Sequence, residues 1–464
     1  MTLADWITWA DDLLWGPGTL VLLMGTGIFL TLRLRLLPWR NLGYALSSAL
    51  GREARATEKP GDVSPFSALM TALAATIGTG NIVGVATALT AGGPGALVWM
   101  ELSALFGMAT KYAECMLSVR FRKRNARGEM SGGPMYVLRD GAGLGRLGAA
   151  LGGVFALFAV CASFGIGGMT QANSIAGALE ATFGVPAGVC GPVTAGLALV
   201  IILGGIRSIS AVADLVVPAM ALFYLAAGAA VIVGNLPHLP EGLALILRCA
   251  FTPRAAAGGA AGAALSWLDA ARWGVARGVF SNEAGLGSAA ITAASASTDS
   301  PVRQGYINMT GTFFDTLVIC TVTGLAICCS GALGAVDAAG QPVDGAALTI
   351  LAFQSVLGPL GGVFVGAAIV LFAFSTILGW EYQGEKAFEY LFGTRPLLLY
   401  RVAFALAALW GAGQHTEVVF RLSDVCNALM CMPNLLSLLL LSGTAARETL
   451  AFQAVLRAKR RQKL

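Results

Sequence analysis

The chain has 464 residues, of which 56% are hydrophobic and only 12% are charged. A soluble domain carries about 25% charged residues, so this composition excludes an ordinary water-soluble protein and indicates a polytopic membrane protein. The net charge of +5 does not indicate a nucleic-acid partner, because the basic residues lie in short clusters between apolar runs.

A helix needs about 20 mostly apolar residues to cross a bilayer. By this criterion the sequence predicts an all-α fold with eleven spans, near residues 15–32, 65–91, 95–119, 150–180, 187–204, 210–234, 267–296, 304–331, 360–390, 396–412 and 418–442. Residues 240–265 are rich in Gly and Ala and are expected to form an outer loop. Residues 346–357 are expected to form a short helix that lies over a central site.

Three clusters of Lys and Arg, within residues 33–59, 120–146 and 447–463, set the expected orientation. With eleven spans all three clusters fall on one side of the membrane, and the loops at 92–94, 181–186 and 332–345 on the other side contain no Lys or Arg. The positive-inside rule then places the N-terminus outside the cell and the C-terminus in the cytoplasm. The membrane is expected to be a plasma membrane, such as a bacterial inner membrane. The basic tail is expected to anchor at the membrane surface.

The second span contains Gly78-Thr79-Gly80-Asn81 in its middle. Each glycine costs about 1 kcal/mol relative to alanine in a helix interior, and Asn81 competes with the helix for backbone hydrogen bonds. A helix broken at membrane depth leaves backbone groups that protein, water or a ligand must satisfy. The segment therefore indicates either a binding site or a glycine-lined helix contact.

The seventh span has a similar run, Phe280 to Gly287, with Glu283 beside its glycines. Glu283 either marks a site, or it is structural and pairs with a cation such as Lys111 or hydrogen-bonds the freed backbone amides. Five spans separate the two breaks, so the chain without its first span divides into five plus five helices of opposite orientation. We expect one transmembrane domain over 1–464, with an extra helix and basic loop (1–60), two repeats (64–235 and 266–443) and a basic tail (444–464). Paired breaks in inverted repeats predict a binding site at the membrane midplane.

Three motifs carry a resemblance to a known family: G-T-G-N-I-V-G from Gly78, A-R-G-V-F-S-N-E-A-G-L-G-S-A from Ala276, and F-S-T-I-L-G-W-E-Y-Q-G-E-K from Phe374. Together they resemble the alanine-or-glycine:cation symporter family, and the likeness covers nearly the whole chain. It implies a LeuT-type inverted-repeat fold with one extra N-terminal helix. It also implies sodium-coupled uptake of alanine or glycine, with the amino acid, the Na⁺ ion and the lipid bilayer as partners.

The resemblance also implies roles for individual residues. The amides of Thr79 and Gly80 are expected to bind the substrate carboxylate, and the full expected substrate set is Thr79, Gly80, Asn81, Gln171, Phe280, Ser281, Asn282, Gly285 and Trp380. Oxygen atoms suited to a cation come from Thr76, Asn81 and Ser281, and a second cation site is expected from Ala74, Ile77, Ser375 and Thr376. For Ser375 and Thr376 the alternative is hydroxyl bonding back to their own helix.

Other polar residues have structural alternatives. Gln171 either binds the substrate or ties helices together, and Asn173 is expected to be a helix tie. Phe280 and Trp380 are expected to wall a pocket that fits a side chain of hydrogen or methyl. Asp315 is expected to be buried and structural. Arg272 and Arg277 are expected to pair with Asp269 or to gate an outer vestibule.

A membrane enzyme is disfavoured because the chain has no H-E-x-x-H, G-x-S-x-G or Cys/His set, and ATP-driven transport because it has no P-loop motif. A channel is disfavoured by the paired breaks within one chain. A proton-coupled carrier and a non-transporting sensor with the carrier fold remain alternatives. The sequence leaves open the choice among alanine, glycine and D-alanine, the stoichiometry, and the oligomeric state.

Overall fold

The computed structural model describes residues 3–251, 267–414 and 417–461. The N-terminal arm contains α1 (Leu3–Leu14), α2 (Pro17–Arg33), α3 (Leu37–Arg40), α4 (Leu42–Leu50) and the 3-10 helix η1 (Arg52–Arg55). The next helices are α5 (Pro65–Thr76), η2 (Thr79–Asn81), α6 (Val83–Gly92), α7 (Ala96–Phe121), α8 (Pro134–Tyr136), η3 (Val137–Gly141), α9 (Arg146–Ala162), η4 (Ser163–Met169), α10 (Thr170–Phe183), α11 (Ala187–Leu203) and α12 (Gly205–Gly234). A small antiparallel hairpin, β1 (Lys123–Arg124) and β2 (Met130–Ser131), follows α7.

The remaining elements are η5 (Leu236–His238), α13 (Leu239–Phe251), α14 (Trp267–Asn282), α15 (Ser288–Ala293), α16 (Pro301–Thr312), η6 (Phe313–Cys320), α17 (Thr321–Ser330), α18 (Gly345–Leu357), α19 (Pro359–Phe392), α20 (Leu397–Gly411) and α21 (Glu417–Arg461). Each of the eleven expected spans corresponds to a helical segment of the described chain. Six helical segments of the described chain are long and apolar enough on their own to cross a membrane, and the first broken span is divided into two shorter apolar helices, α5 and α6.

Proline and serine residues set the starts of several helices. Proline occupies the first turn of α2, α5, α16 and α19, where its missing N–H costs no helical hydrogen bond. The side chain of Ser64 caps α5 by accepting from Ser67 N–H at 3.0 Å, and Ser300 caps α16 in the same way. These caps fix where the two helices begin.

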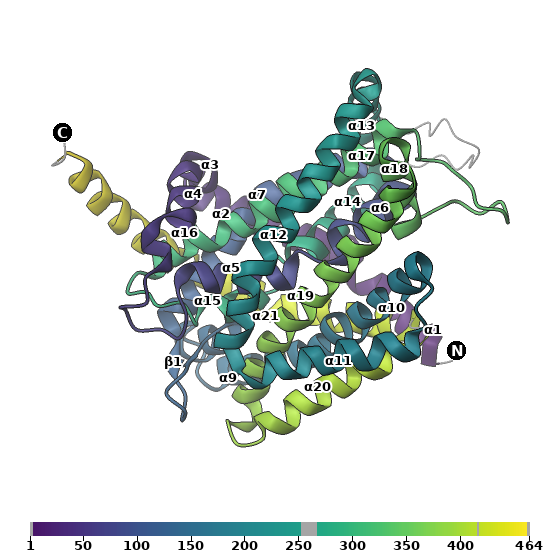
Figure 1. The fold of residues 1–464 in the computed structure, drawn as a ribbon. Coiled ribbons are helices and arrows are strands. Elements are labelled where there is room, and N and C mark those ends of the chain that lie inside the picture. The colour runs from purple at the N-terminus through teal and green to yellow at the C-terminus, as the bar shows by residue number, and fades with distance from the viewer. Residues whose placement is uncertain (1–2, 252–266, 415–416, 462–464) are drawn as a thin grey trace.

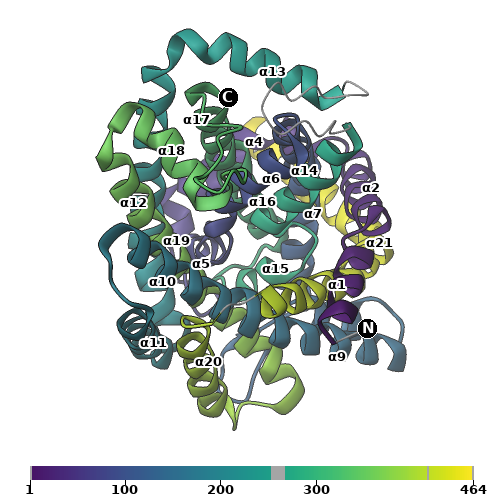
Figure 2. The same cartoon turned by 90° about the vertical axis from the view of Figure 1, so that its right-hand side faces the viewer.

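The helices pack so that short, broken elements lie inside and long apolar helices lie outside. Every residue of α15 is buried, and in Figure 2 α15 and α6 lie inside a ring of longer helices. Large apolar side chains on the outer helices are exposed, for example Val200 at 72% and Leu215 at 73%. Such a surface suits lipid, since soluble monomers rarely expose large apolar patches.

The expected outer loop at 240–265 is wrong for its first half, because α13 occupies Leu239–Phe251. Gly242, Ile246, Cys249 and Ala250 are buried and recur at helical spacing. The Gly/Ala-rich composition concealed this amphipathic pattern, and residues 252–266 lie outside the described residues. The short helix expected at 346–357 is confirmed as α18, and its Thr349 hydroxyl donates to the Ile82 carbonyl at 3.2 Å. The last span does not end at 442 but continues as one helix to Arg461.

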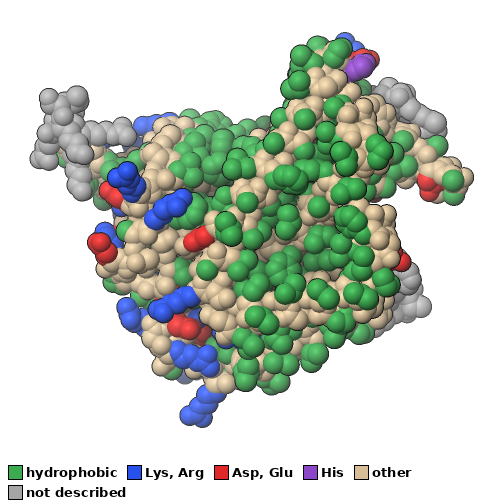
Figure 3. Space-filling model, viewed as in Figure 1, with side chains coloured by type: hydrophobic (Ala, Val, Ile, Leu, Met, Phe, Trp, Pro, Cys, Tyr) green, Lys and Arg blue, Asp and Glu red, His purple; other side chains and the backbone are tan. Residues whose placement is uncertain are grey.

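The two ends of the described chain lie on opposite sides of the molecule. In Figure 1, α1 lies at the right and the end of α21 at the left, as an odd number of spans requires. Figure 3 shows most of the visible Lys and Arg side chains on the left, on the same side as the end of α21. The orientation predicted by the positive-inside rule assigns this basic side to the cytoplasm.

Labelling of single cysteines with a membrane-impermeant reagent tests that orientation. Asp5→Cys is expected to react from outside intact cells, and Lys463→Cys only after the cells are opened. The nine native cysteines must first be replaced, and the cysteine-free protein is the control for background. Labelling of Lys463→Cys in intact cells would reverse the assignment.

Candidate functional site

The first helix break has the geometry that its glycines predict. Helix α5 ends at Thr76, and Gly78 has extended backbone (φ −140°, ψ −155°) before the short turn of η2. The Asn81 side chain stabilises the break, because its Oδ1 accepts from Gly78 N–H at 2.9 Å. Asn81 therefore satisfies broken backbone, and its amide oxygen retains a second lone pair for another partner.

The second break lies between α14 and α15. Glu283, Gly285 and Gly287 all have positive φ, at 55°, 94° and 85°. This backbone region costs little for glycine but is uncommon for other residues, so Glu283 is held there by its surroundings. The Ser288 hydroxyl donates to the Glu283 carboxylate, whereas Lys111 forms its ion pair with Glu114 at 3.5 Å.

The two breaks touch at Gly80 and Ser281. A Cβ atom added at Gly80 would lie 3.3 Å from Ser281 Cα and 3.6 Å from the Phe280 ring. Only a glycine permits this approach without displacing backbone. The predicted meeting of the two broken spans is therefore present in the fold.

Asp315 joins both breaks to the π-helical turn η6. Its carboxylate accepts from Asn81 Nδ2 at 2.8 Å and from Ser281 Oγ at 2.9 Å. The Thr316 hydroxyl donates to the same carboxylate at 2.8 Å, and Asp315 is completely buried. Asp315 was expected to be structural, and its burial is confirmed. Its position among two expected cation ligands was not foreseen, although a carboxylate in a membrane span is itself a signal of function.

Thr79 and Gln171 also lie together. The Thr79 hydroxyl donates to Gln171 Oε1 at 3.3 Å, and Gln171 Nε2 donates to the Ile166 carbonyl at 3.1 Å. The π-helical turn η4, just before Gln171, lets α10 present this side chain to the first break. Asn173 donates to the Gln414 carbonyl at 2.9 Å, which confirms it as a helix tie.

A cavity of about 790 Å³ leads to the two breaks. Thr79, Gly80 and Phe280 line its inner end, together with Ile166 and Thr170 of the η4–α10 segment. Its outer part is lined by charged residues of α1, α14 and α21: Asp11, Asp12, Arg272, Arg277, Arg421 and Asp424. The cavity thus connects the surface beside α1 with the first break.

The charged mouth contains an ion pair that differs from the expected pairing with Asp269. Arg272 forms an ion pair with Asp12 of α1 at 3.5 Å, a partner that was not foreseen. The Arg277 guanidinium lies 5.5 Å from the Phe280 ring centre and 5.6 Å from that of Trp273. Arg277 therefore lies between the mouth and the inner end, as a vestibule residue should.

Several expected site residues lie apart from the cavity. Asn282 donates to the Thr316 hydroxyl at 3.1 Å and caps Ala284 N–H. Gly285 N–H donates to Glu114, and its carbonyl accepts from Asn434 Nδ2 at 2.9 Å. Trp380 is 1% exposed, and it packs in the same apolar cluster as Ile166 and Ala75. Of the nine expected substrate residues, Thr79, Gly80 and Phe280 line the cavity, and the other six do not: Asn81, Gln171, Ser281, Asn282, Gly285 and Trp380.

The hydroxyl groups of the expected second cation site bond within their own helix. Ser375 and Thr376 both donate to the Phe372 carbonyl at 2.9 Å, so both hydroxyls bond back to their own helix, as the structural alternative predicts. Thr76 donates in the same way to Ala72 and Leu73. A Cβ atom at Gly78 would lie 2.6 Å from Thr376 Oγ1, so α19 touches the first break beside Ala74 and Ile77.

Comparisons with known proteins agree with this architecture. The model of the sodium:alanine symporter family matches residues 1–464. The chain is 48% identical to the sodium/alanine symporter AgcS of Methanococcus maripaludis, over 98% of both chains. It is also 37% identical to the probable sodium/glutamine symporter GlnT of Bacillus subtilis, over 93% of this chain and 87% of that protein.

The chain belongs to the sodium:alanine symporter family. This confirms the resemblance found in the motifs, and it makes the protein a sodium-coupled amino-acid symporter rather than an enzyme. Among solved structures, MhsT in complex with L-phenylalanine aligns with a TM-score of 0.52 and 18% identity, over 83% of this chain and 89% of that chain. That alignment confirms the LeuT-type fold.

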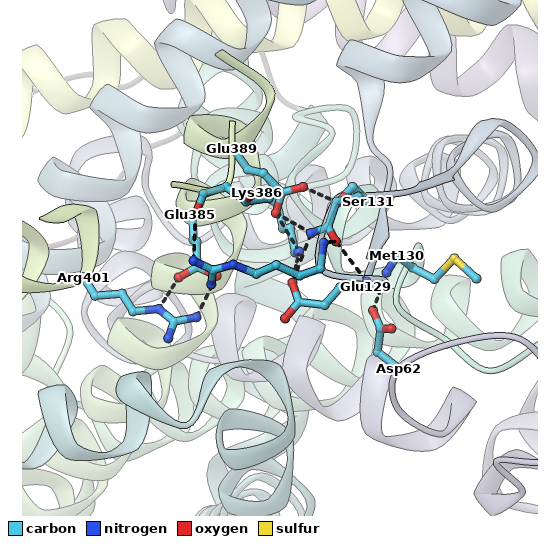
Figure 4. A network of polar contacts seen from close by, with 11 residues as sticks. Asp62, Glu129, Met130, Ser131, Glu385, Lys386, Glu389 and Arg401 are labelled. Atoms are coloured by element: carbon cyan, nitrogen blue, oxygen red, sulfur yellow. Dashed lines mark hydrogen bonds and ion pairs between the residues drawn. The ribbon is translucent and has the colours of Figure 1, made fainter. Parts of the chain in front are cut away.

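An ionic network joins α19 to the β1–β2 hairpin (Figure 4). The Lys386 ammonium of α19 lies 2.9 Å from both Glu129 of the β1–β2 hairpin and Glu389. Ser131 of β2 also donates to Glu389, at 2.6 Å. Burial alone would raise the pKa of Glu129, but the Lys386 ammonium lowers it on balance. The network fastens the hairpin to α19.

Further contacts fasten the same hairpin to both broken spans. Met130 N–H donates to Asp62, just before α5, at 2.8 Å. The Arg122 guanidinium donates to the carbonyls of Ala294 and Ala296, just after α15, at 2.8 and 2.6 Å. These contacts hold the hairpin against both broken spans, on the side of the molecule away from α1 and the cavity mouth (Figure 1).

Proposed function

We propose that the symporter carries alanine or glycine into the cell together with sodium, and that substrate and ion meet at the contact between the two helix breaks. The observation that supports this most is the Asp315 cluster, which lies between Asn81 of the first break and Ser281 of the second. Na⁺ is a hard cation, and such ions prefer oxygen ligands. Hydroxyl groups rotate, so Ser281 and Thr316 can turn lone pairs toward an ion.

The substrate carboxylate would bind at the inner end of the cavity. Broken backbone at Thr79 and Gly80 offers N–H groups there, beside the Thr79 hydroxyl and Gln171. Phe280 lies on the other side of the same end. In this arrangement the substrate anion and the Asp315 anion both face the ion, so the ion screens their mutual repulsion.

The second cation site is proposed to be formed by the carbonyls of Ala74 and Ile77 with Ser375 and Thr376. Support comes from the close approach of Thr376 to Gly78, which places α19 against the unwound segment. The Thr76 hydroxyl is proposed as a further oxygen ligand near the first break, together with Asn81 and Ser281. Filling this site would require the Ser375 and Thr376 hydroxyls to exchange their bonds to Phe372 for the ion.

The cavity beside α1 and the fastening of the hairpin to α19 and both broken spans on the other side support an outward-facing state. The proposed orientation places the mouth outside the cell and the Lys386 network at the cytoplasmic side. Release of substrate into the cytoplasm would then require the network to separate and the mouth to close. This exchange is alternating access about a fixed midplane site.

Uptake of labelled alanine and glycine into proteoliposomes tests the proposed function. An inward sodium gradient is expected to drive accumulation of both amino acids, and an ionophore that dissipates the gradient is expected to abolish it. Liposomes without protein are the control. Uptake that is independent of any cation gradient would refute the proposal.

Substrate size is proposed to depend on Trp380, which packs with Ile166 behind the inner end of the cavity. Trp380→Ala is expected to widen the substrate range toward serine or larger amino acids, because it removes the bulk that supports this wall. Competition of unlabelled amino acids against labelled alanine measures the range. Unchanged selectivity at normal expression would show that Trp380 only fills the core.

A further inference from the structure

A polar groove lies far from the transport site, between α4 and the last turns of α21. Its volume is about 90 Å³, and it is lined by Arg40, Asn41, Tyr44, Gln453, Leu456 and Arg457. Two arginines thus approach one small space from different helices. In the described part of the chain, none of the residues that line it is acidic.

The floor of the groove is organised by Tyr306 of α16, which is fully buried. Its hydroxyl accepts from Asn41 Nδ2 at 2.6 Å and from Gln453 Nε2 at 3.0 Å. The Tyr44 ring meets the Tyr306 ring edge to face at 5.1 Å. The amide side chains are therefore held in place on both walls before any ligand arrives.

The arginines of the groove are available for an anion. Arg40 donates to the Arg35 carbonyl at 3.1 Å, which holds its guanidinium at the groove without neutralising it. Among the described residues Arg457 forms no ion pair. Glu53, which follows α4, and Glu448, which lies earlier on α21, form ion pairs with Arg303 and Arg120. Guanidinium groups match phosphate oxygens with two parallel hydrogen bonds.

Exposed apolar side chains surround this basic groove. Trp39 is 45% exposed, Leu50 is 60% exposed and Val455 is 53% exposed. Tryptophan beside basic residues is typical of the membrane–water boundary, where arginine keeps its charge at the headgroups while its stem contacts acyl chains. A ligand at this level would bring both a phosphate and hydrocarbon to the protein.

We propose that the groove binds the phosphate headgroup of an anionic phospholipid, held by Arg40 of α3 and Arg457 of α21. The expected orientation places the end of α21 on the cytoplasmic side of the membrane. Basic pockets between helices on the cytoplasmic side of membrane proteins are suited to such headgroups. The lipid would join the N-terminal arm to the end of the last helix. The proposal does not depend on the transported substrate.

Native mass spectrometry of the delipidated protein in detergent tests the proposal, with phosphatidylglycerol, phosphatidylcholine and glycerol 3-phosphate as probes. The wild type is expected to bind phosphatidylglycerol at least ~10-fold more tightly than phosphatidylcholine. The Arg40→Gln/Arg457→Gln variant is expected to lose this preference. Arg40→Lys/Arg457→Lys, which keeps the charge but not the planar fork, is expected to be intermediate.

The matched control is Arg146→Gln/Arg395→Gln, which removes two exposed arginines outside the groove and the same net charge. It is expected to bind phosphatidylglycerol as the wild type does. Unchanged calorimetric binding of alanine shows that each variant is folded. An equal loss of the phosphatidylglycerol preference in the control and in the groove variant would overturn the site. Binding of glycerol 3-phosphate as tight as that of phosphatidylglycerol would overturn the assignment of the site to a lipid.

Discussion

Asp315→Asn is expected to weaken the apparent affinity for sodium at least ~10-fold, which corresponds to about 1.4 kcal/mol or more. The substitution keeps the size of the side chain but removes a buried negative charge where charges interact strongly. It also replaces the carboxylate oxygen that accepts from the Ser281 and Thr316 hydroxyls with an NH2 group if the amide oxygen stays toward Asn81 Nδ2, so these hydroxyls lose a shared acceptor. Alanine uptake at limiting sodium is expected to fall together with the sodium affinity. Sodium titration of uptake in proteoliposomes measures the effect.

Two further variants separate ion binding from architecture. Asn81→Ala is expected to weaken alanine binding at limiting sodium, with much of the loss recovered at saturating sodium. Ser375→Ala is expected to shift the sodium dependence with less effect on substrate contacts, because it lies in the proposed second site. A loss of thermal stability at every sodium concentration, with an unchanged sodium dependence of uptake, would make Asn81 and Asp315 purely structural.

Gly80→Ala is expected to lower alanine uptake at least ~10-fold. The added Cβ would lie 3.3 Å from Ser281 Cα, a backbone atom that cannot rotate away, so the two breaks must move apart. Small displacements of groups that position a substrate have large effects on turnover. Initial uptake rates at matched amounts of protein in the liposomes measure the loss.

Gly84→Ala is the control for this change. Gly84 is buried, lines the same cavity and lies one turn further along, but an added Cβ would meet no atom within 4 Å. Its uptake is expected to stay within about twofold of the wild type, since alanine also favours the helix. Equal uptake by both glycine variants would show that the contact between the breaks does not shape the site.

The sequence predicted most of the fold because the length of an apolar run is a local property. Glycine positions located both breaks for the same reason, since residues 78–81 and 280–287 can be judged without their neighbours in space. The contacts of Asp315 could not be read in this way. Its partner Asn81 lies 234 positions away, and only the folded chain brings η6 between the two breaks.

The cavity mouth shows the same limit. Asp11 and Asp12 stand in α1, ahead of the predicted spans, and nothing local indicates that they face Arg272 and Arg421. Trp380 was expected at the pocket because its motif matched a family pattern. In the fold it lies one layer behind, since Gly167 on η4 lets α19 approach until a Cβ there would be 2.3 Å from Trp380 Cβ.

Calorimetric titration of the purified symporter with alanine across a series of sodium concentrations tests the shared site most directly. If ion and substrate meet at the two breaks, each must strengthen the binding of the other by the same factor. The alanine affinity is therefore expected to rise with sodium, and the sodium affinity to rise equally with alanine. An alanine affinity that depends on neither sodium nor any other cation would contradict the shared site.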